Sequence, residues 1–170
     1  MDILLLTLRL VHIVAGSLWV GFAVFVSFML SPAIEDVGPA AAEIMPALGR
    51  RGIMTVLPAL ALATVLSGFG LYWRIAGGAL GVFLQTRTGG ALALSGLAAV
   101  VAYLVGILVT RPAMMGAVRI LHGLAGASVE DRARQLAVAG ELRSRGARAG
   151  RFGAALLLAA ATGMAEARYL

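Results

Sequence analysis

The sequence predicts an all-α integral membrane protein, a four-helix bundle that forms a single transmembrane domain over residues 1–170. Composition is the first reason: 61% of the 170 residues are hydrophobic, 13% are charged, and the mean hydropathy is +0.95. A soluble domain carries about 25% charged residues. The second reason is that four apolar runs recur along the chain. Crossing a hydrocarbon core of about 30 Å takes about 20 helical residues.

The expected spans cover about residues 3–30, 53–73, 88–110 and 152–169. The first span is expected to stay in the mature protein, because its start, MDILLL, lacks the basic segment of a signal peptide and its apolar run is too long. The fourth span has the shortest uninterrupted apolar run, Phe152 to Ala165. We therefore expect arginines at its two ends to snorkel to the interface.

The arginines predict the orientation of the chain. All fourteen basic residues are arginine, and ten of them lie in the loops 31–52 and 111–151, against four elsewhere. Positive charge collects on the cytoplasmic side. The two loops are therefore expected in the cytoplasm and both termini outside, in the periplasm of a bacterial inner membrane. Four arginines form a basic collar before the fourth span, where they are expected to contact lipid headgroups: Arg143, Arg145, Arg148 and Arg151.

The long cytoplasmic loop contains a helix start signal. Ser128 is followed three positions later by Asp131, a variant of the capping box. An amphipathic helix is expected to follow, with Leu136 and Leu142 on its apolar side. It either lies on the membrane surface or continues into the fourth span. The chain shows no convincing internal repeat and no separate soluble domain.

The first helix carries one polar face. At 100° per residue, six polar, small or aromatic residues fall within an arc of about 80°: Arg9, His12, Gly16, Trp19, Ala23 and Ser27. An ionisable group that points at lipid costs about 2.5 kcal/mol or more. This stripe is therefore expected to face the interior of the bundle.

The fourth helix offers two matching features. Ala155, Ala159, Gly163 and Ala167, at four-residue spacing, predict a small-residue seam for close helix packing. Gly16 of the first helix is also expected to pack against a neighbouring helix. With both termini outside, Arg9 and Glu166 lie at the same edge of the membrane. We expect an ion pair between them that ties the first helix to the fourth. The alternative is that each side chain snorkels separately to water.

His12 is open to three interpretations. It forms a packing hydrogen bond to a neighbouring helix, or it binds haem iron or copper through a neutral imidazole, or it relays protons or tunes a pigment or quinone in a larger assembly. Trp19 is a candidate to line a flat cofactor, and Met164 is a candidate second ligand for copper. His122 belongs to the cytoplasmic loop, so it does not complete a bis-histidine haem site in one chain.

The pattern H-x3-G-x2-W-x-G, made by His12, Gly16, Trp19 and Gly21, resembles the opening helix of a group of bacterial four-helix membrane proteins. The group includes the copper-resistance D-type membrane domain and the small haem-binding protoporphyrinogen oxidase. The resemblance implies a four-helix bundle with haem b or copper near His12. The oxidases are expected to carry a lysine in a later span and the copper proteins further outer histidines. Their absence here speaks against both activities.

No catalytic constellation is visible: the sequence has no carboxylate pair, serine motif or phosphate-binding loop. We therefore expect a non-catalytic protein with no nucleic-acid partner. The preferred hypothesis is an accessory or structural subunit that packs against a larger respiratory, photosynthetic or transport complex, or against further copies of itself. The alternative is a protein that binds haem or copper at His12. One intramembrane histidine without a clear partner ligand favours the first.

Overall fold

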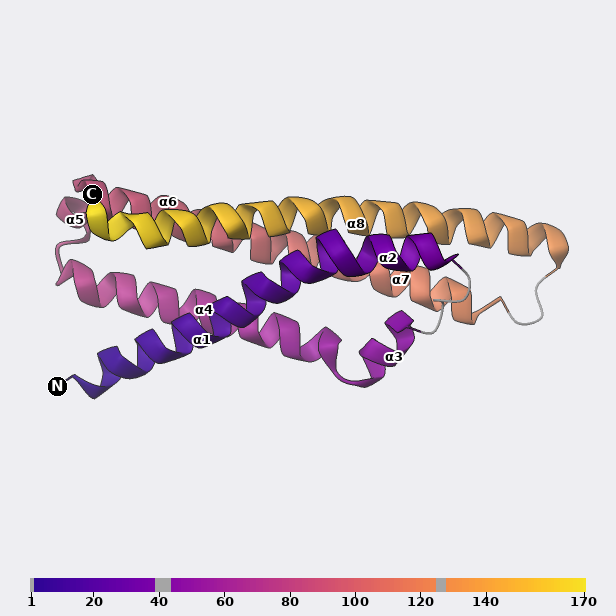
Figure 1. Ribbon diagram of the computed structural model, residues 1–170, viewed down its shortest axis with the longest axis horizontal. Helices are drawn as coiled ribbons and strands as arrows, with labels where there is room; N and C mark the ends of the chain where they lie inside the picture. Colours follow the sequence, from indigo (N-terminus) through magenta and orange to yellow (C-terminus); the bar gives the residue numbers. More distant parts are fainter. Residues whose placement is uncertain (1, 39–43, 125–127) are drawn as a thin grey trace.

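The computed structural model describes residues 2–38, 44–124 and 128–170, and all regular structure in these segments is helical (Figure 1). The all-α prediction is thus confirmed. Three helical segments have the length and composition to cross a membrane: Ile3–Val37, Ile53–Ala76 and Arg87–His122. Their apolar surfaces indicate a lipid bilayer as the environment of this chain.

The first segment runs through three consecutive helical pieces. Helix α1, Ile3–Phe25, begins at Asp2, whose carboxylate accepts a hydrogen bond from the Leu5 backbone N–H at 3.2 Å. It passes into a π-helical turn, η1, Val26–Leu30, and then into α2, Ser31–Val37. Figure 1 shows the chain changing direction at this turn, so that α2 runs nearly parallel to the last helix.

The middle of the chain forms the second and third segments. Helix α3, Ile44–Arg50, precedes α4, Ile53–Ala76, and the short α5, Leu80–Gln85, follows it. Helix α6, Arg87–Val105, then passes through a second π-helical turn, η3, Gly106–Thr110, into α7, Arg111–His122. Thr86 caps α6 by accepting a hydrogen bond from the Gly89 N–H at 2.9 Å.

The two π turns reveal an internal repeat. Each is five residues long, and each is followed by a helix with proline at its second position, Pro32 or Pro112. Equivalent residues are 80 positions apart, as Val26 and Gly106 show. Proline lacks an N–H and its ring clashes with the preceding turn of an α-helix. A wider π turn directly before it lets the helix continue. Few side chains match, which is why the sequence hides the repeat.

Both expected cytoplasmic loops are therefore largely helical. The segment 31–52 contains α2 and α3, and the segment 111–151 contains α7 and the first part of the last helix. The first and third spans were expected to end at residues 30 and 110, but the π turns carry the helix past Pro32 and Pro112.

Helix α8, Val129–Glu166, is continuous over 38 residues and ends in a short 3₁₀ turn, Ala167–Tyr169. At 1.5 Å per residue it is about 57 Å long. Ser128 caps it as predicted: its Oγ accepts from the Asp131 N–H at 3.1 Å and donates to the Asp131 carboxylate at 2.8 Å. The amphipathic helix thus runs straight into the last apolar stretch. Leu142 packs against Gly116 of α7, whereas Leu136 is exposed.

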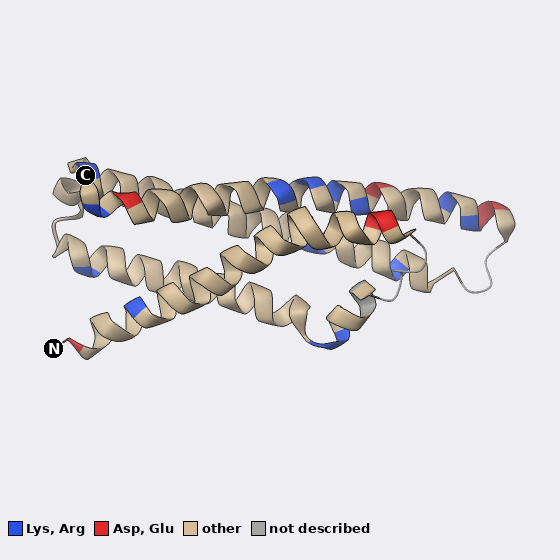
Figure 2. Ribbon diagram, viewed as in Figure 1, with Lys and Arg blue, Asp and Glu red and all other residues tan. Residues whose placement is uncertain are grey.

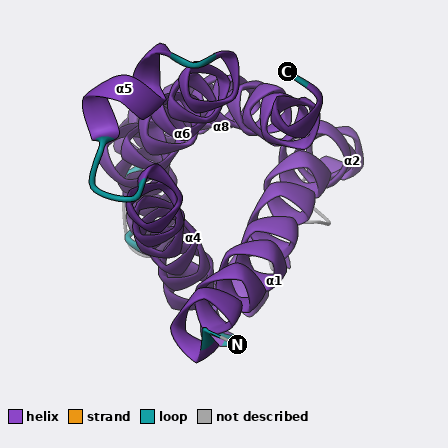
Figure 3. Ribbon diagram, turned by 90° about the vertical axis from the view of Figure 1, so that its left-hand side faces the viewer, coloured by secondary structure: helices purple, strands orange, loops and turns teal. Residues whose placement is uncertain are grey.

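The long helices α1, α4, α6 and α8 surround a common axis (Figure 3), and their closest packing is in two pairs, α1 with α4 and α6 with α8. Helix α7 packs against the first part of α8. Where the helices cross, the core is built mainly of small side chains around one indole: Trp19, Ala61, Ala99, Ala102, Leu157 and Ala160.

The predicted small-residue seam of α8 lies only partly on the contact face. Gly163 packs on Ser95 of α6 and Ala167 is buried, but Ala155 and Ala159 are exposed. Buried residues instead recur in steps of seven, at Gly146, Gly153, Ala160 and Ala167, with Leu157 between them. Steps of four drift by 40° each, whereas a step of seven drifts by only 20°. The four-residue pattern therefore describes a stripe that crosses the contact face obliquely.

Candidate functional site

His12 sits between α1 and α4. Its Nδ1 lies 2.9 Å from the backbone carbonyl oxygen of Thr64 and 3.4 Å from Ser67 Oγ. A carbonyl oxygen only accepts, so Nδ1 carries the proton and donates it. The other ring nitrogen, Nε2, then keeps its lone pair. This is the tautomer in which a histidine can bind a metal through Nε2.

Helix α4 is built to receive this ring. The Thr64 hydroxyl donates to Leu60 O at 2.8 Å, and the Ser67 hydroxyl to Ala63 O at 2.6 Å, so both hydroxyls are held by their own helix. Gly68 lies directly against the imidazole: a Cβ there would come within 2.9 Å of His12 Cε1. The backbone of α4 can approach His12 this closely because residue 68 is glycine.

Further small residues keep α1 close to α4 on both sides of His12. A Cβ at Gly16 would lie 3.2 Å from Thr64 Cγ2, and one at Gly70 would lie 3.2 Å from Leu8 Cδ1. Gly16 thus lies at the contact between α1 and α4. Sequence reasoning missed Thr64, Ser67 and Gly68 as neighbours of His12. Their common signal was a hydroxyl face next to a glycine in an otherwise apolar helix.

The polar stripe of α1 faces inward only beyond its first residue. Trp19 and Ser27 are buried, and His12 is half-buried. A Cβ at Gly150 would come 3.4 Å from Ser27 Oγ, so the inner end of α1 has moved from α4 to α8. Arg9, by contrast, is exposed. The polar stripe therefore faces the interior of the bundle from His12 to Ser27, as expected, but not at Arg9.

Arg9 and Glu166 are not brought together. Both are exposed, and no ion pair joins them in the described residues. Figure 1 gives the reason: the first half of α1 follows α4 and diverges from the end of α8, which stays on α6. The ion pair at this end joins Asp2 to Arg74 and so ties α1 to α4.

Asp2 has a second role in that pair. The hydrogen bond from the Leu5 N–H, and after it the Arg74 guanidinium, hold the pKa of the Asp2 carboxyl below its ordinary value. The charged form of Asp2 therefore both caps α1 and pairs with α4. No feature of the sequence indicated Arg74 as its partner, because the two residues are 72 positions apart.

The other two residues expected near a cofactor, Trp19 and Met164, lie away from the ring of His12. Trp19 forms an edge-to-face contact with Tyr103 of α6, with ring centroids 6.5 Å apart and an interplanar angle of 85°. Met164 is half-buried on α8, next to Gly163, which packs on α6. His12 finds its neighbours on α4 instead. A copper site of His12 with Met164 thus does not fit, and no cluster of three metal-binding side chains occurs in the part of the chain that the structure describes.

All four arginines of the collar are exposed. Arg143, Arg145, Arg148 and Arg151 lie along the middle of α8, where Figure 2 shows a blue stretch between an apolar half and a charged half of the molecule. The apolar half contains α1, α4 and α6 with few charges. The collar thus lies at the position where a membrane boundary is expected.

Comparisons with family models, with curated proteins and with solved structures find no match to this chain. Its function is therefore argued from its own residues.

Proposed function

We propose that this protein is a non-catalytic accessory subunit of the bacterial inner membrane, with four spans and both termini in the periplasm. In this proposal the outer face of α8 receives a transmembrane helix of a partner, either a subunit of a larger membrane complex or a second copy of the chain. The observation that carries it is the difference between the exposed face of α8 and the exposed faces of the other spans.

The exposed faces of α1, α4 and α6 consist of large apolar side chains suited to lipid, such as Leu10, Leu66 and Leu97. In the apolar part of α8 only Phe152 and Leu158 are large and exposed. The rest of its exposed face is small or polar, and four of these residues fall within an arc of about 60°: Ala155, Ala159, Thr162 and Glu166. Small and hydroxyl side chains are typical of helix–helix interfaces in membranes.

The length of the apolar stretch supports the same proposal. Phe152 to Ala165 extends for about 21 Å at 1.5 Å per residue, short of a core of about 30 Å. Helix α8 is also not among the three segments with clear membrane-spanning length and composition. A neighbouring helix against its outer face, with the arginine collar at the cytoplasmic boundary, stabilises it in the bilayer.

The test is site-specific photo-crosslinking in native membranes. A photoreactive amino acid replaces Ala159 on the outer face of α8, and the matched control replaces Leu97, which is exposed on α6. We expect a discrete protein adduct from position 159, with the crosslinked peptide mapping to a transmembrane helix, and only lipid adducts from position 97. Protein adducts of equal yield at both positions, or at neither, contradict the proposal.

A bulky variant separates partner binding from folding. Ala159→Leu adds an exposed apolar side chain, so the chain itself is expected to fold as before. The same variant fills the shallow face against which the partner helix packs. We expect the adduct from a photoreactive residue at position 155 to be lost in Ala159→Leu. An unchanged adduct would show that this face is not the contact.

A second candidate function rests on the His12 tautomer. The Nδ1–H···O=C bond to Thr64 leaves Nε2 as a neutral donor, which suits an axial haem ligand, as the resemblance of the opening helix implies. Haem would supply redox or electron-transfer chemistry. His12 would hold the iron, and Thr64 and Ser67 would fix the orientation of the ring. Met164 has no part in such a site.

Absorption spectroscopy tests this candidate. The protein is purified in mild detergent, its oxidised and dithionite-reduced spectra are recorded, and its metals are measured. A Soret band that is present in the wild type and absent in His12→Ala would establish the haem site. A colourless and metal-free preparation that retains its helical circular dichroism spectrum excludes it for the isolated chain, and His12 is then a packing residue.

A further inference from the structure

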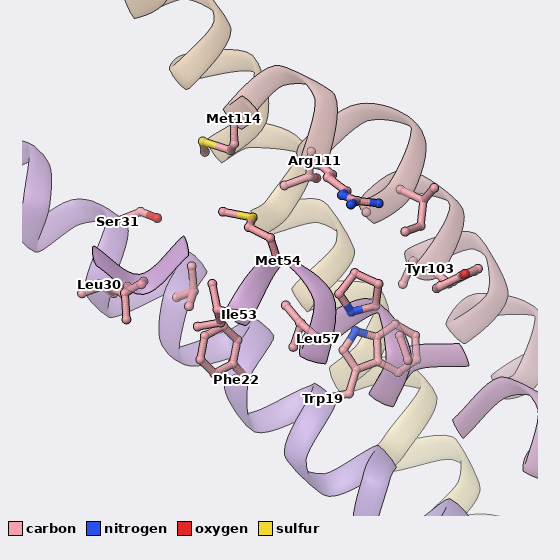
Figure 4. A pocket seen from close by; sticks show the side chains of 18 residues that line it. Trp19, Phe22, Leu30, Ser31, Ile53, Met54, Leu57, Tyr103, Arg111 and Met114 are labelled. Atoms are coloured by element: carbon pink, nitrogen blue, oxygen red, sulfur yellow. The ribbon is translucent and has the colours of Figure 1, made fainter. Parts of the chain in front are cut away.

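A cavity of about 180 Å³ lies where the two π turns face each other (Figure 4). Equivalent positions of the internal repeat line it: Phe22 and Ala102, Val26 and Gly106, Leu30 and Thr110, Ser31 and Arg111. Helix α4 closes the third side with Met54, Leu57 and Pro58. The cavity is thus a product of the repeat, and it is separate from His12, which does not line it.

The cavity exists because three helices depart from regular geometry at one level. The π turns widen α1 and α6, and Pro58 interrupts the hydrogen bonding of α4. Irregular turns keep side chains from interlocking as they do on regular helices, and π turns are frequent at functional sites. A cavity of about 150 Å³ is enough to bind benzene. This one therefore has room for a ring or for a single alkyl chain of medium length.

The walls of the cavity are mainly apolar, with Trp19, Phe22 and Leu57 turned toward it (Figure 4). Three polar side chains also line it, Ser31, Thr110 and Arg111, and Figure 4 shows Ser31 and the Arg111 guanidinium on opposite sides. Arg111 is the one charged residue among the described lining residues, and no described carboxylate forms an ion pair with it. The wall of the cavity thus includes one positive charge that no carboxylate of the described chain balances.

We propose that this cavity binds a medium-chain fatty acid, with its carboxylate on Arg111 and its chain against the apolar wall that Trp19, Phe22 and Leu57 form. The single charge of Arg111 matches the single charge of a carboxylate, which guanidinium binds with two parallel hydrogen bonds. A phosphate monoester carries up to two charges and is matched less well.

Trp19 itself provides the readout. The chain has two tryptophans, so Trp73→Phe leaves Trp19 as the only one. This variant is placed in nanodiscs of uncharged phosphatidylcholine and titrated with ω-bromodecanoate, whose bromine quenches tryptophan fluorescence on contact. We expect saturable quenching.

Three variants test the residues involved. In Arg111→Gln the Kd is expected to rise about tenfold, because a charge-assisted hydrogen bond is lost. Arg119→Gln is the matched control, since Arg119 lies on the same helix, is exposed and does not line the cavity; its Kd is expected to equal that of the parent. Gly106→Leu places a large side chain in the cavity, so it is expected to abolish saturable quenching. A Cβ at this position meets no atom within 4 Å, so the helical circular dichroism spectrum is expected to persist.

Three results would overturn the proposal. Quenching that rises linearly without saturation, and equally in all variants, would mean that the probe acts only from the lipid phase. Equal Kd values for ω-bromodecanol and ω-bromodecanoate would remove the role of the carboxylate. Tighter binding of ω-bromodecyl phosphate would assign the cavity to a phosphate-bearing amphiphile. None of these outcomes depends on a partner helix at α8.

Discussion

Replacing Gly68 by alanine tests how closely α4 holds His12. The added Cβ would lie 2.9 Å from Cε1 and 3.3 Å from Nδ1 of the imidazole, whereas carbon atoms in contact are about 3.5–4.0 Å apart. The ring must withdraw by about 0.6 Å or more. Its 2.9 Å hydrogen bond to the Thr64 carbonyl then lengthens to about 3.5 Å, the limit of a hydrogen bond.

The expected cost follows from three contributions. Loss of the hydrogen bond costs about 1 kcal/mol, and forcing an extra methyl group into a packed contact costs about 1–3 kcal/mol. Alanine in place of glycine stabilises a helix by about 1 kcal/mol. The free energy of unfolding of Gly68→Ala is therefore expected to fall by about 1–3 kcal/mol. In a His12→Ala background the obstacle is gone, and Gly68→Ala is expected to be neutral or stabilising by up to about 1 kcal/mol.

The assay is a double-mutant cycle in mixed micelles, with unfolding by SDS followed by far-UV circular dichroism. Gly96→Ala is the control, because a Cβ at this position of α6 meets no atom within 4 Å. It is expected to have the same small effect in both backgrounds. If Gly68→Ala changes stability by the same amount with and without His12, the two residues are not in contact and the reasoning about the site fails.

Three further predictions concern the α8 surface, the topology and the N-terminal cap. Ala154→Leu, at a buried position, is expected to lower the free energy of unfolding by about 1–3 kcal/mol, whereas Ala155→Leu at the neighbouring position leaves the free energy of unfolding unchanged. Equal effects of the two substitutions in SDS titrations would contradict the assignment of a buried and an exposed face to α8. The chain has no cysteine, so a single introduced cysteine can report on which side of the membrane it lies. In spheroplasts, Ala79→Cys is expected to react with an impermeant maleimide, whereas Ser128→Cys is expected to react only after lysis. The opposite pattern would show that the chain has the inverse orientation. Folding lowers the pKa of Asp2, so the charged carboxylate stabilises the folded state above the ordinary pKa of 3.8, and this stabilisation is lost as the pH falls below that value. The free energy of unfolding is therefore expected to fall more for wild type than for Asp2→Asn between pH 5 and about pH 2. Parallel pH curves for the two proteins would show that Asp2 contributes nothing.

Local patterns predicted the features that depend on one helix. Composition and apolar length gave the all-α class, and the Ser128 cap follows from two residues within one turn. The inward face of α1 from His12 to Ser27 also follows from its own periodicity. These features need no knowledge of which helix packs against which.

Features that depend on the crossing of helices escaped sequence reasoning. The partner of His12 is a backbone carbonyl, which no side-chain pattern encodes. The Arg9–Glu166 pair was expected because both residues belong to the same membrane edge, but α1 diverges from α8 there and Asp2 pairs with Arg74 instead. The first and third spans were expected to end at residues 30 and 110, whereas the helices continue through π turns past the prolines there.

The mass of the particle in its own membrane tests the central claim most directly. The protein is extracted with surrounding lipid by a polymer, without detergent, and measured by native mass spectrometry. The account predicts a complex heavier than the 17.5 kDa chain by the mass of a partner or of further copies, and its dissociation to 17.5 kDa in the double variant Ala155→Leu with Ala159→Leu. A wild-type particle of 17.5 kDa, or a complex that the double variant leaves intact, would contradict it.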